Sequence, residues 1–210
     1  MLTNTILEVQ KEFDIIFIQE LLWSLIWSIL SSLNERGEQL VGVLNHPNWI
    51  TFSRNSSSNY NSFKVILYIN IKLLQFCFSL RKDIFNHKDI SYISFFNSGS
   101  IYFFINIYSN LSQIALKYLK DTEANINNIL VMVGDFNIRN NSQDPFFLHH
   151  SIYRNLLTNI VDSMNLCISK STNQVSTRYL DNQNDLNSTI NLMFLRPNSS
   201  KLNNHIIYPE

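Results

Sequence analysis

The sequence predicts an α/β (α+β) fold in which helices cover β-sheets. Three observations support this prediction: short apolar runs recur along the chain, segments with helical spacing of apolar residues lie between them, and the chain is long enough for a sizeable core. Its 210 residues are 45% hydrophobic and 15% charged, which is typical of a globular protein and excludes a disordered or coiled-coil chain. Length alone predicts a single domain over residues 1–210.

Strands are predicted where short runs rich in Val, Ile, Phe and Tyr occur. These runs are residues 14–19, 63–70, 75–80, 89–96, 100–108 and 129–133, with shorter ones near 176 and over 189–195. Asn97-Ser98-Gly99 separates the fourth run from the fifth, and small polar residues in that place predict a β-hairpin. Helices are predicted where apolar residues recur at helical spacing, over residues 2–13, 112–128 and 146–164. Residues 45–61 are a polar stretch.

The most apolar run, residues 21–33, raises the question of a membrane segment. It contains 13 residues, whereas a membrane-spanning helix needs about 20. Glu20 precedes the run, and Glu35 and Arg36 follow it closely. We therefore expect residues 23–33 to form a helix that packs on a sheet or covers its end, and we expect no membrane association.

The charge and the cysteine content limit which partners and which cellular compartment we expect for the protein. Lys+Arg 16 balances Asp+Glu 16, so any nucleic-acid contact must come from a local patch. Cys77 and Cys167 cannot build a disulfide framework and form no CxxC pair for zinc. The N-terminus lacks the basic and apolar pattern of a signal peptide. We expect a monomer in the nucleus or the cytoplasm that is not secreted.

Candidate catalytic residues stand where predicted strands end. Glu20 follows the first predicted strand, Tyr108 ends the hairpin, and Asp135 and Asn137 follow the run that ends before Gly134. Strand alternation predicts that Asp135 and Asn137 lie on one side. An acid or a phenol at a strand end can face a cleft from a rigid support. A single residue of this kind is more often a solvated cap or the end of a core strand. Only the four residues together indicate a catalytic site.

Three segments taken in order, IFIQE, FFINIYSN and VMVGDFN, resemble the endonuclease/exonuclease/phosphatase family of metal-dependent phosphodiester hydrolases. HPNWITFSR, FSLRKDI and STINLMFL are similar to the endonuclease domains of LINE-type retrotransposons, especially fungal ones, which accompany a reverse transcriptase. The similarity covers nearly the whole chain. It implies a four-layer αββα sandwich of two mixed β-sheets flanked by helices.

The resemblance also implies a role for each motif residue. Glu20 would hold Mg²⁺ or Mn²⁺, since an oxygen ligand suits an ion that keeps most of its waters. Tyr108 would contact the scissile phosphate. Asp135 would orient and deprotonate the attacking water, and the Asn137 amide would hold the phosphate or the leaving oxygen. DNA is the implied partner, and no organic cofactor is implied.

The chain departs from the family pattern in three places. Asn191, in STINLMFL, stands where the family has an aspartate that orients a histidine, and an amide neither favours the imidazolium nor fixes its tautomer. The Asn of the family's first strand is absent, because this chain starts at the following helix. The family's closing Ser-Asp-His is absent, because the chain stops at Glu210. We therefore expect a domain that is truncated at both ends and impaired in activity.

Three functions remain open at this point. The first is a DNA-nicking endonuclease, the second is a catalytically inactive retroelement remnant, and the third is a small membrane-associated protein that uses residues 21–33. Motif integrity separates the first two, since four motif residues are present whereas Asn191 replaces an aspartate. The sequence supports membership of the family more strongly than it supports activity.

Overall fold

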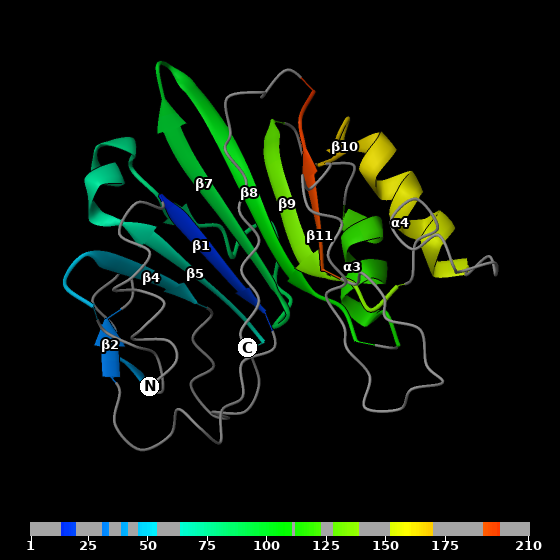
Figure 1. Cartoon of the computed structure of the whole chain (residues 1–210), viewed down its shortest axis with the longest axis horizontal. Coiled ribbons are helices and arrows are strands. Elements are labelled where there is room, and N and C mark those ends of the chain that lie inside the picture. The colour runs from blue at the N-terminus through cyan, green and yellow to red at the C-terminus, as the bar shows by residue number, and fades with distance from the viewer. Residues whose placement is uncertain are drawn as a thin grey trace, which may run out of the picture. The chain divides into compact units, whose positions relative to one another are not determined.

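The structure is a computed structural model of the 210-residue chain (Figure 1). It describes residues 14–19, 31–33, 39–41, 46–53, 64–110, 112–122, 128–138, 152–169 and 191–197. The chain divides into two compact units, Met1–Tyr108 and Ser109–Glu210.

The first unit contains a three-stranded antiparallel sheet. Its strands, in spatial order, are β1 (Ile15–Gln19), β5 (Val65–Asn70) and β4 (Trp49–Ser53). Every residue of the central strand β5 is buried, which explains why its sequence VILYIN is apolar almost throughout rather than alternating. β4 lies in the polar stretch 45–61, where the sequence predicts no strand. It forms because Trp49 and Phe52 are buried there against β5.

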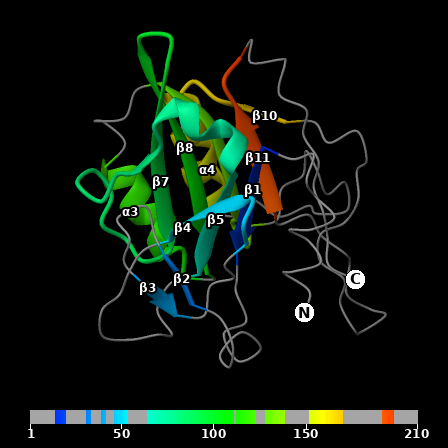
Figure 2. The ribbon, with the colours of Figure 1, turned by 90° about the vertical axis from the view of Figure 1, so that its left-hand side faces the viewer.

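A long antiparallel hairpin forms the second sheet of this unit. Its strands are β7 (Ile90–Asn97) and β8 (Ser100–Tyr108), and β6 (Ser79–Leu80) pairs with β7. The turn residues Ser98 and Gly99 both have left-handed backbone, with φ of 50° and 81°, as a two-residue type I′ turn requires. The predicted hairpin is confirmed, and its tip projects beyond the other strands of the unit (Figure 2).

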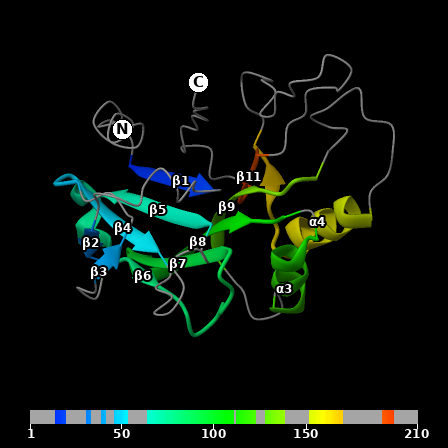
Figure 3. The same cartoon turned by 90° about the horizontal axis from the view of Figure 1, so that it is seen from below.

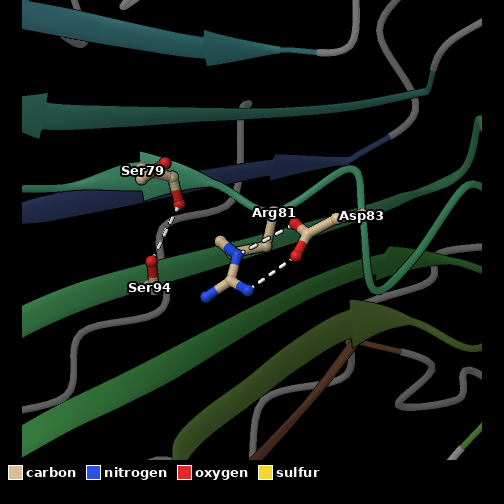
Figure 4. A network of polar contacts seen from close by, with 4 residues as sticks. All are labelled: Ser79, Arg81, Asp83 and Ser94. Carbon is tan, nitrogen blue, oxygen red and sulfur yellow. Dashed lines mark hydrogen bonds and ion pairs between the residues drawn. The ribbon is translucent and has the colours of Figure 1, made fainter.

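Side-chain and backbone bonds fasten β6 to β7 (Figure 4). The Arg81 N–H donates to the Tyr92 carbonyl at 2.8 Å, and the Ser94 hydroxyl donates to the Ser79 carbonyl at 3.4 Å. The Arg81 guanidinium donates to both carboxylate oxygens of Asp83, at 2.9 and 2.6 Å. This pairing lowers the pKa of Asp83 and raises the pKa of Arg81.

The two sheets of the first unit lie face to face (Figure 3). Because side chains alternate along a strand, Phe104, Asn106 and Tyr108 share the face of β8 that points toward β1 and β5. Phe104 meets Phe17 of β1 edge to face, with 6.2 Å between ring centroids. The core between the sheets is therefore largely aromatic, and Asn106 is a polar exception within it.

Residues 31–33 correct one prediction. β2 (Ser31–Leu33) pairs with β3 (Gln39–Val41), so the predicted helix over residues 23–33 is wrong in its last three residues. Pairing with β3 satisfies the backbone of these residues, which outweighs the helical spacing of the apolar run. Residues 21–30 lie outside the described residues.

The predicted strand over residues 75–80 is also wrong at its start. Residues 71–76 form the 3₁₀ helix η1 (Ile71–Phe76), and the strand is limited to β6. The Asn70 side chain accepts the Lys72 N–H at 3.2 Å and caps the first turn of η1. Cys77 ends the helix with left-handed backbone, φ 44°. Local capping thus overrides the strand-like composition of this segment.

In its described residues, the second unit combines three strands with two helices. The strands, in spatial order, are β10 (Cys167–Ile168), β11 (Asn191–Leu195) and β9 (Ile129–Asp135), and the helices are α3 (Ile114–Thr122) and α4 (Ile152–Ser163). The helices pack on each other, and Lys117 lies 5.2 Å from the ring centroid of Tyr153. Buried Leu119 and Ile160 belong to the apolar stripes that the sequence predicts for them.

The predicted α+β character is confirmed, because helices accompany strands that pair into sheets. The predicted helix over residues 2–13 and the strand near 176 lie outside the described residues. In the part of the chain that is described, none of the helices combines the length and the apolar character that a membrane crossing needs.

The hairpin turn yields a prediction about stability. A Cβ added at Gly99 would meet no atom within 4 Å, so Gly99→Ala should destabilise the chain by left-handed backbone strain alone, by about 1 kcal/mol. Ser98→Gly is the matched control and should change stability little, because relief of strain is offset by greater freedom of the unfolded chain. Urea denaturation measures both variants, and equal stability of Gly99→Ala and the original chain would contradict the turn assignment.

Candidate active site

The structure describes the side chains of three of the five predicted site residues. Tyr108 ends β8 in the first unit, and Asp135 and Asn137 lie at the end of β9 in the second. Asn191 is described through its backbone, as the first residue of β11. Glu20 lies outside the described residues, directly after the last residue of β1 in the sequence.

A tight turn after β9 joins Asp135 to Asn137. The Asp135 Oδ1 accepts the Asn137 N–H at 3.0 Å, and Asn137 has left-handed backbone, φ 48°, which asparagine tolerates better than most residues. β9 ends at Asp135, so the predicted strand alternation does not extend to Asn137. The turn, rather than the strand, fixes the spacing between this carboxylate and this amide.

The backbone of Ser109 ties this turn to the segment that follows β8. The Ser109 N–H donates to the Asp135 carbonyl at 2.8 Å, and the Asn137 Nδ2 donates to the Ser109 carbonyl at 3.1 Å. Ser109 is fully buried and follows Tyr108 directly in the sequence. Two of the predicted site residues are therefore bonded to the residue next to a third.

Gln113 supports the same turn from the start of α3. It is 1% exposed, its Nε2 donates to the Phe136 carbonyl at 2.8 Å, and its Oε1 accepts the Ser109 hydroxyl at 2.6 Å. The Gln113 carbonyl accepts the Lys117 N–H at 3.0 Å, in the first turn of α3. The sequence motifs do not predict Ser109 or Gln113 as site residues, and Gln113 is expected only within a helix. Their spacing of four residues before an apolar helix was the available signal.

Asn191 is the register partner of Asp135. The antiparallel pairing of β11 with β9 begins at this pair and continues through Leu192 with Gly134. The position at which the resemblance implies an aspartate thus stands directly opposite Asp135 in the backbone ladder.

Tyr108 is held at the end of the hairpin, next to a buried acid. The Tyr108 N–H donates to the Asp89 carbonyl at 2.9 Å, which continues the β7–β8 register by one pair. Asp89 is 8% exposed, and its Oδ1 has no hydrogen-bond partner. Burial raises the pKa of the Asp89 carboxyl, and the charges of Lys88 and Lys64 reduce that rise.

Asn106, two residues before Tyr108, bonds to both strands of the opposite sheet. Its Nδ2 donates to the carbonyls of Ile18 and Ile66, at 3.2 and 2.9 Å, and its Oδ1 accepts the Gln19 Nε2 at 2.6 Å. Asn106 is 1% exposed. Gln19 is the last residue of β1, so this network reaches the residue that precedes Glu20.

The polar groups near β9 suit a hard cation better than a soft one. Within the described ranges no three His, Cys, Asp or Glu side chains gather in one place. The Asn137 side-chain oxygen and the neighbouring carboxylate of Asp135 are both oxygen donors. Few protein oxygens and several retained waters are what Mg²⁺ prefers.

Comparison with solved structures defines the class of fold. No family model and no curated protein matches the sequence. The endonuclease domain of TRAS1, a telomere-specific non-LTR retrotransposon, matches over 92% of this chain and 77% of its own, with a TM-score of 0.62 and 12% identity. D. rerio TDP2, solved with a single-strand DNA product, matches over 92% and 74%, with a TM-score of 0.50 and 13% identity.

This chain therefore has the same fold as these two structures, and this agrees with the fold that the resemblance implies. Both of the matching structures are similar to it over nearly its whole length, at a sequence identity that supports the fold alone. The predicted sandwich of two sheets with flanking helices is confirmed at this level.

The buried acid beside Tyr108 gives a pH-dependent prediction. The raised pKa of Asp89 means that the folded state disfavours its carboxylate, so stability is lost as the pH rises from the ordinary aspartate pKa of about 4 through the folded value. Asp89→Asn should therefore raise the melting temperature at pH 7, and this gain should shrink below about pH 4. Thermal denaturation across that range measures it.

Asp83→Asn is the matched control, because hydrogen bonding to Arg81 lowers the pKa of Asp83. It should leave stability at pH 7 unchanged or slightly reduced, since exposed ion pairs contribute little. A gain from both substitutions, or from neither, would contradict the assignment of Asp89.

The support under the Asp135 turn gives a second prediction. Gln113→Leu leaves the Ser109 hydroxyl and the Phe136 carbonyl without their partner, and each buried orphan costs about 1–3 kcal/mol. Gln75→Leu, at an exposed position of η1, should change stability by less than about 0.5 kcal/mol. Urea denaturation compares the two, and equal effects would show that the Gln113 bonds contribute nothing.

Proposed function

We propose that this chain is a divalent-metal-dependent phosphodiester hydrolase that nicks DNA, with impaired activity. The observation that carries the proposal is the turn after β9, which presents the Asp135 carboxylate and the Asn137 amide, bonded to the residue that follows Tyr108. Its context is a fold found in nuclease domains. We further propose that residues 1–210 form one such domain and act as a monomer.

Asp135 is the proposed general base. It would take a proton from water as the water oxygen forms a bond to phosphorus, while the bond to the leaving oxygen breaks and that oxygen is protonated by solvent. The bond from the Asn137 N–H fixes the orientation of the carboxylate. At 4% exposure Asp135 is shielded from bulk water, which strengthens its electrostatic interactions with a bound substrate.

Asn137 and Tyr108 are the proposed phosphate contacts. One proton of the Asn137 amide is donated to the Ser109 carbonyl, and the second can be donated to a phosphate oxygen or the leaving oxygen. The Tyr108 phenol would donate to another phosphate oxygen. Donors that are fixed in place before charge develops stabilise a transition state without reorganisation.

Glu20 is the proposed ligand for Mg²⁺ or Mn²⁺. An ion bound there would supply Lewis-acid neutralisation of the phosphate charge. The oxygen donors near β9 are compatible with this choice of cation.

A catalytically inactive remnant is the second candidate, and Asn191 favours it. An amide stands opposite Asp135 in the register of β11 and β9, where the resemblance implies an acid. Loss of an orienting acid would impair hydrolysis but would leave the groups that bind DNA and metal in place. Binding of DNA and metal would therefore outlast hydrolysis.

Relaxation of supercoiled plasmid tests the proposal. With Mg²⁺ the chain should nick plasmid far more slowly than a complete family domain, and Asp135→Ala should lower that rate by a further factor of about 10²–10⁴, the usual contribution of a general base. Asp162→Ala, at an exposed position of α4, should leave it unchanged. Nicking that survives Asp135→Ala would exclude Asp135 as the base, and Mg²⁺ binding without any nicking would favour the remnant.

A further inference from the structure

We propose that Asn106 is a positioning residue that fixes the metal-binding end of β1 relative to the phosphate-contacting end of β8. The inference rests on the proposed function, because it takes Glu20 as the metal ligand and Tyr108 as the phosphate contact. Its physical basis is the set of three hydrogen bonds that Asn106 makes inside the first unit.

These bonds use every polar atom of the Asn106 side chain. Two carbonyls, of Ile18 and Ile66, lie on its nitrogen side, and a carbonyl can only accept. The amide therefore has one orientation, with its oxygen toward Gln19. A side chain with both amide protons and its oxygen engaged cannot rotate without losing several bonds at once.

The bonds join three strands through one residue. Ile18 and Ile66 are register partners in β1 and β5, and Asn106 projects from β8 in the facing sheet. The two sheets otherwise meet through apolar contacts such as Phe17 with Phe104, which resist separation but tolerate sliding. A directional bond to two carbonyls fixes the position of β8 along β1 and β5.

Both proposed functional groups are close in the sequence to the residues that the Asn106 bonds join. Tyr108 lies two residues beyond Asn106, on the same face of β8. Glu20 follows Gln19 directly in the sequence, and the Gln19 side chain is bonded to Asn106 at 2.6 Å. Catalytic groups must be held within roughly 0.5 Å of the productive geometry by the residues around them. Asn106 can do this because it bonds β8 to β1 and β5 close to the ends of β1 and β8.

No simple replacement would make the same link. Leucine matches the size of asparagine but makes none of these three bonds, and aspartate cannot donate to a carbonyl when ionised. An apolar residue would suit the aromatic face of β8 better on packing grounds alone. A buried amide among Phe104 and Phe17 is thus better explained by positioning than by stability.

Binding of Mn²⁺ to the full chain, followed by electron paramagnetic resonance, tests the inference. Gln19→Leu removes one bond of the link, and Asn106→Leu removes all three. Both variants should weaken Mn²⁺ binding, by about 10- to 100-fold for Asn106→Leu, as is usual when the support of a metal ligand is removed. Gln19→Leu alters only a half-buried side chain and keeps the test valid if Asn106→Leu fails to fold.

Ile105→Val is the matched control. Ile105 is fully buried on the opposite face of β8, so the substitution disturbs packing without touching the link, and Mn²⁺ affinity should stay unchanged. If the original chain binds Mn²⁺ and Glu20→Gln abolishes that binding, unchanged affinity in the folded Gln19 and Asn106 variants overturns this inference alone. If Glu20→Gln has no effect on Mn²⁺ binding, the proposed metal site fails and the inference fails with it.

Discussion

The structure of the first unit depends on one buried amide. Asn106 joins β8 to β1 and β5 through bonds that reach across 88 and 40 residues of sequence. Aromatic packing accounts for the cohesion of the two sheets, but it does not fix their relative position. The directional bonds of Asn106 do, and they act at the strand ends where Gln19 and Tyr108 lie.

In the second unit, side-chain and backbone bonds fix the position of a turn. A turn closed by Asp135 and Asn137 is bonded to Ser109, and Gln113 supports both sides of it. These bonds fix a carboxylate and an amide at the end of β9. Because Ser109 follows Tyr108 directly, the covalent chain connects the two bonded networks. A hydrolase that activates water and binds phosphate needs groups held in this manner, and this is the physical content of the proposed function.

Much of the fold could be predicted because it is encoded locally. The apolar runs of β1, β5, β7, β8, β9 and β11 and the turn at Ser98-Gly99 are legible in the sequence. The sequence does not predict β4, because its burial depends on β5. It predicts a strand over part of η1, because composition does not show that Asn70 caps a helix there. The motifs predict Tyr108, Asp135 and Asn137 as site residues, and their roles stay predictions. Asn106 bonds to strands that are far away in the sequence, so its role could not be predicted.

Mn²⁺ titration of the ¹⁵N-labelled chain tests the central claim, the proposal that Glu20 binds the metal ion and that Asn106 fixes the end of β1 relative to the end of β8. Bound Mn²⁺ is paramagnetic and broadens the NMR signals of the backbone amides that lie near it. The account predicts that the signals of Gln19, Asn106 and Tyr108, which all belong to the first unit, broaden together at low Mn²⁺, and that Glu20→Gln abolishes all three effects. Broadening confined to Gln19, or broadening that persists in Glu20→Gln, would contradict it.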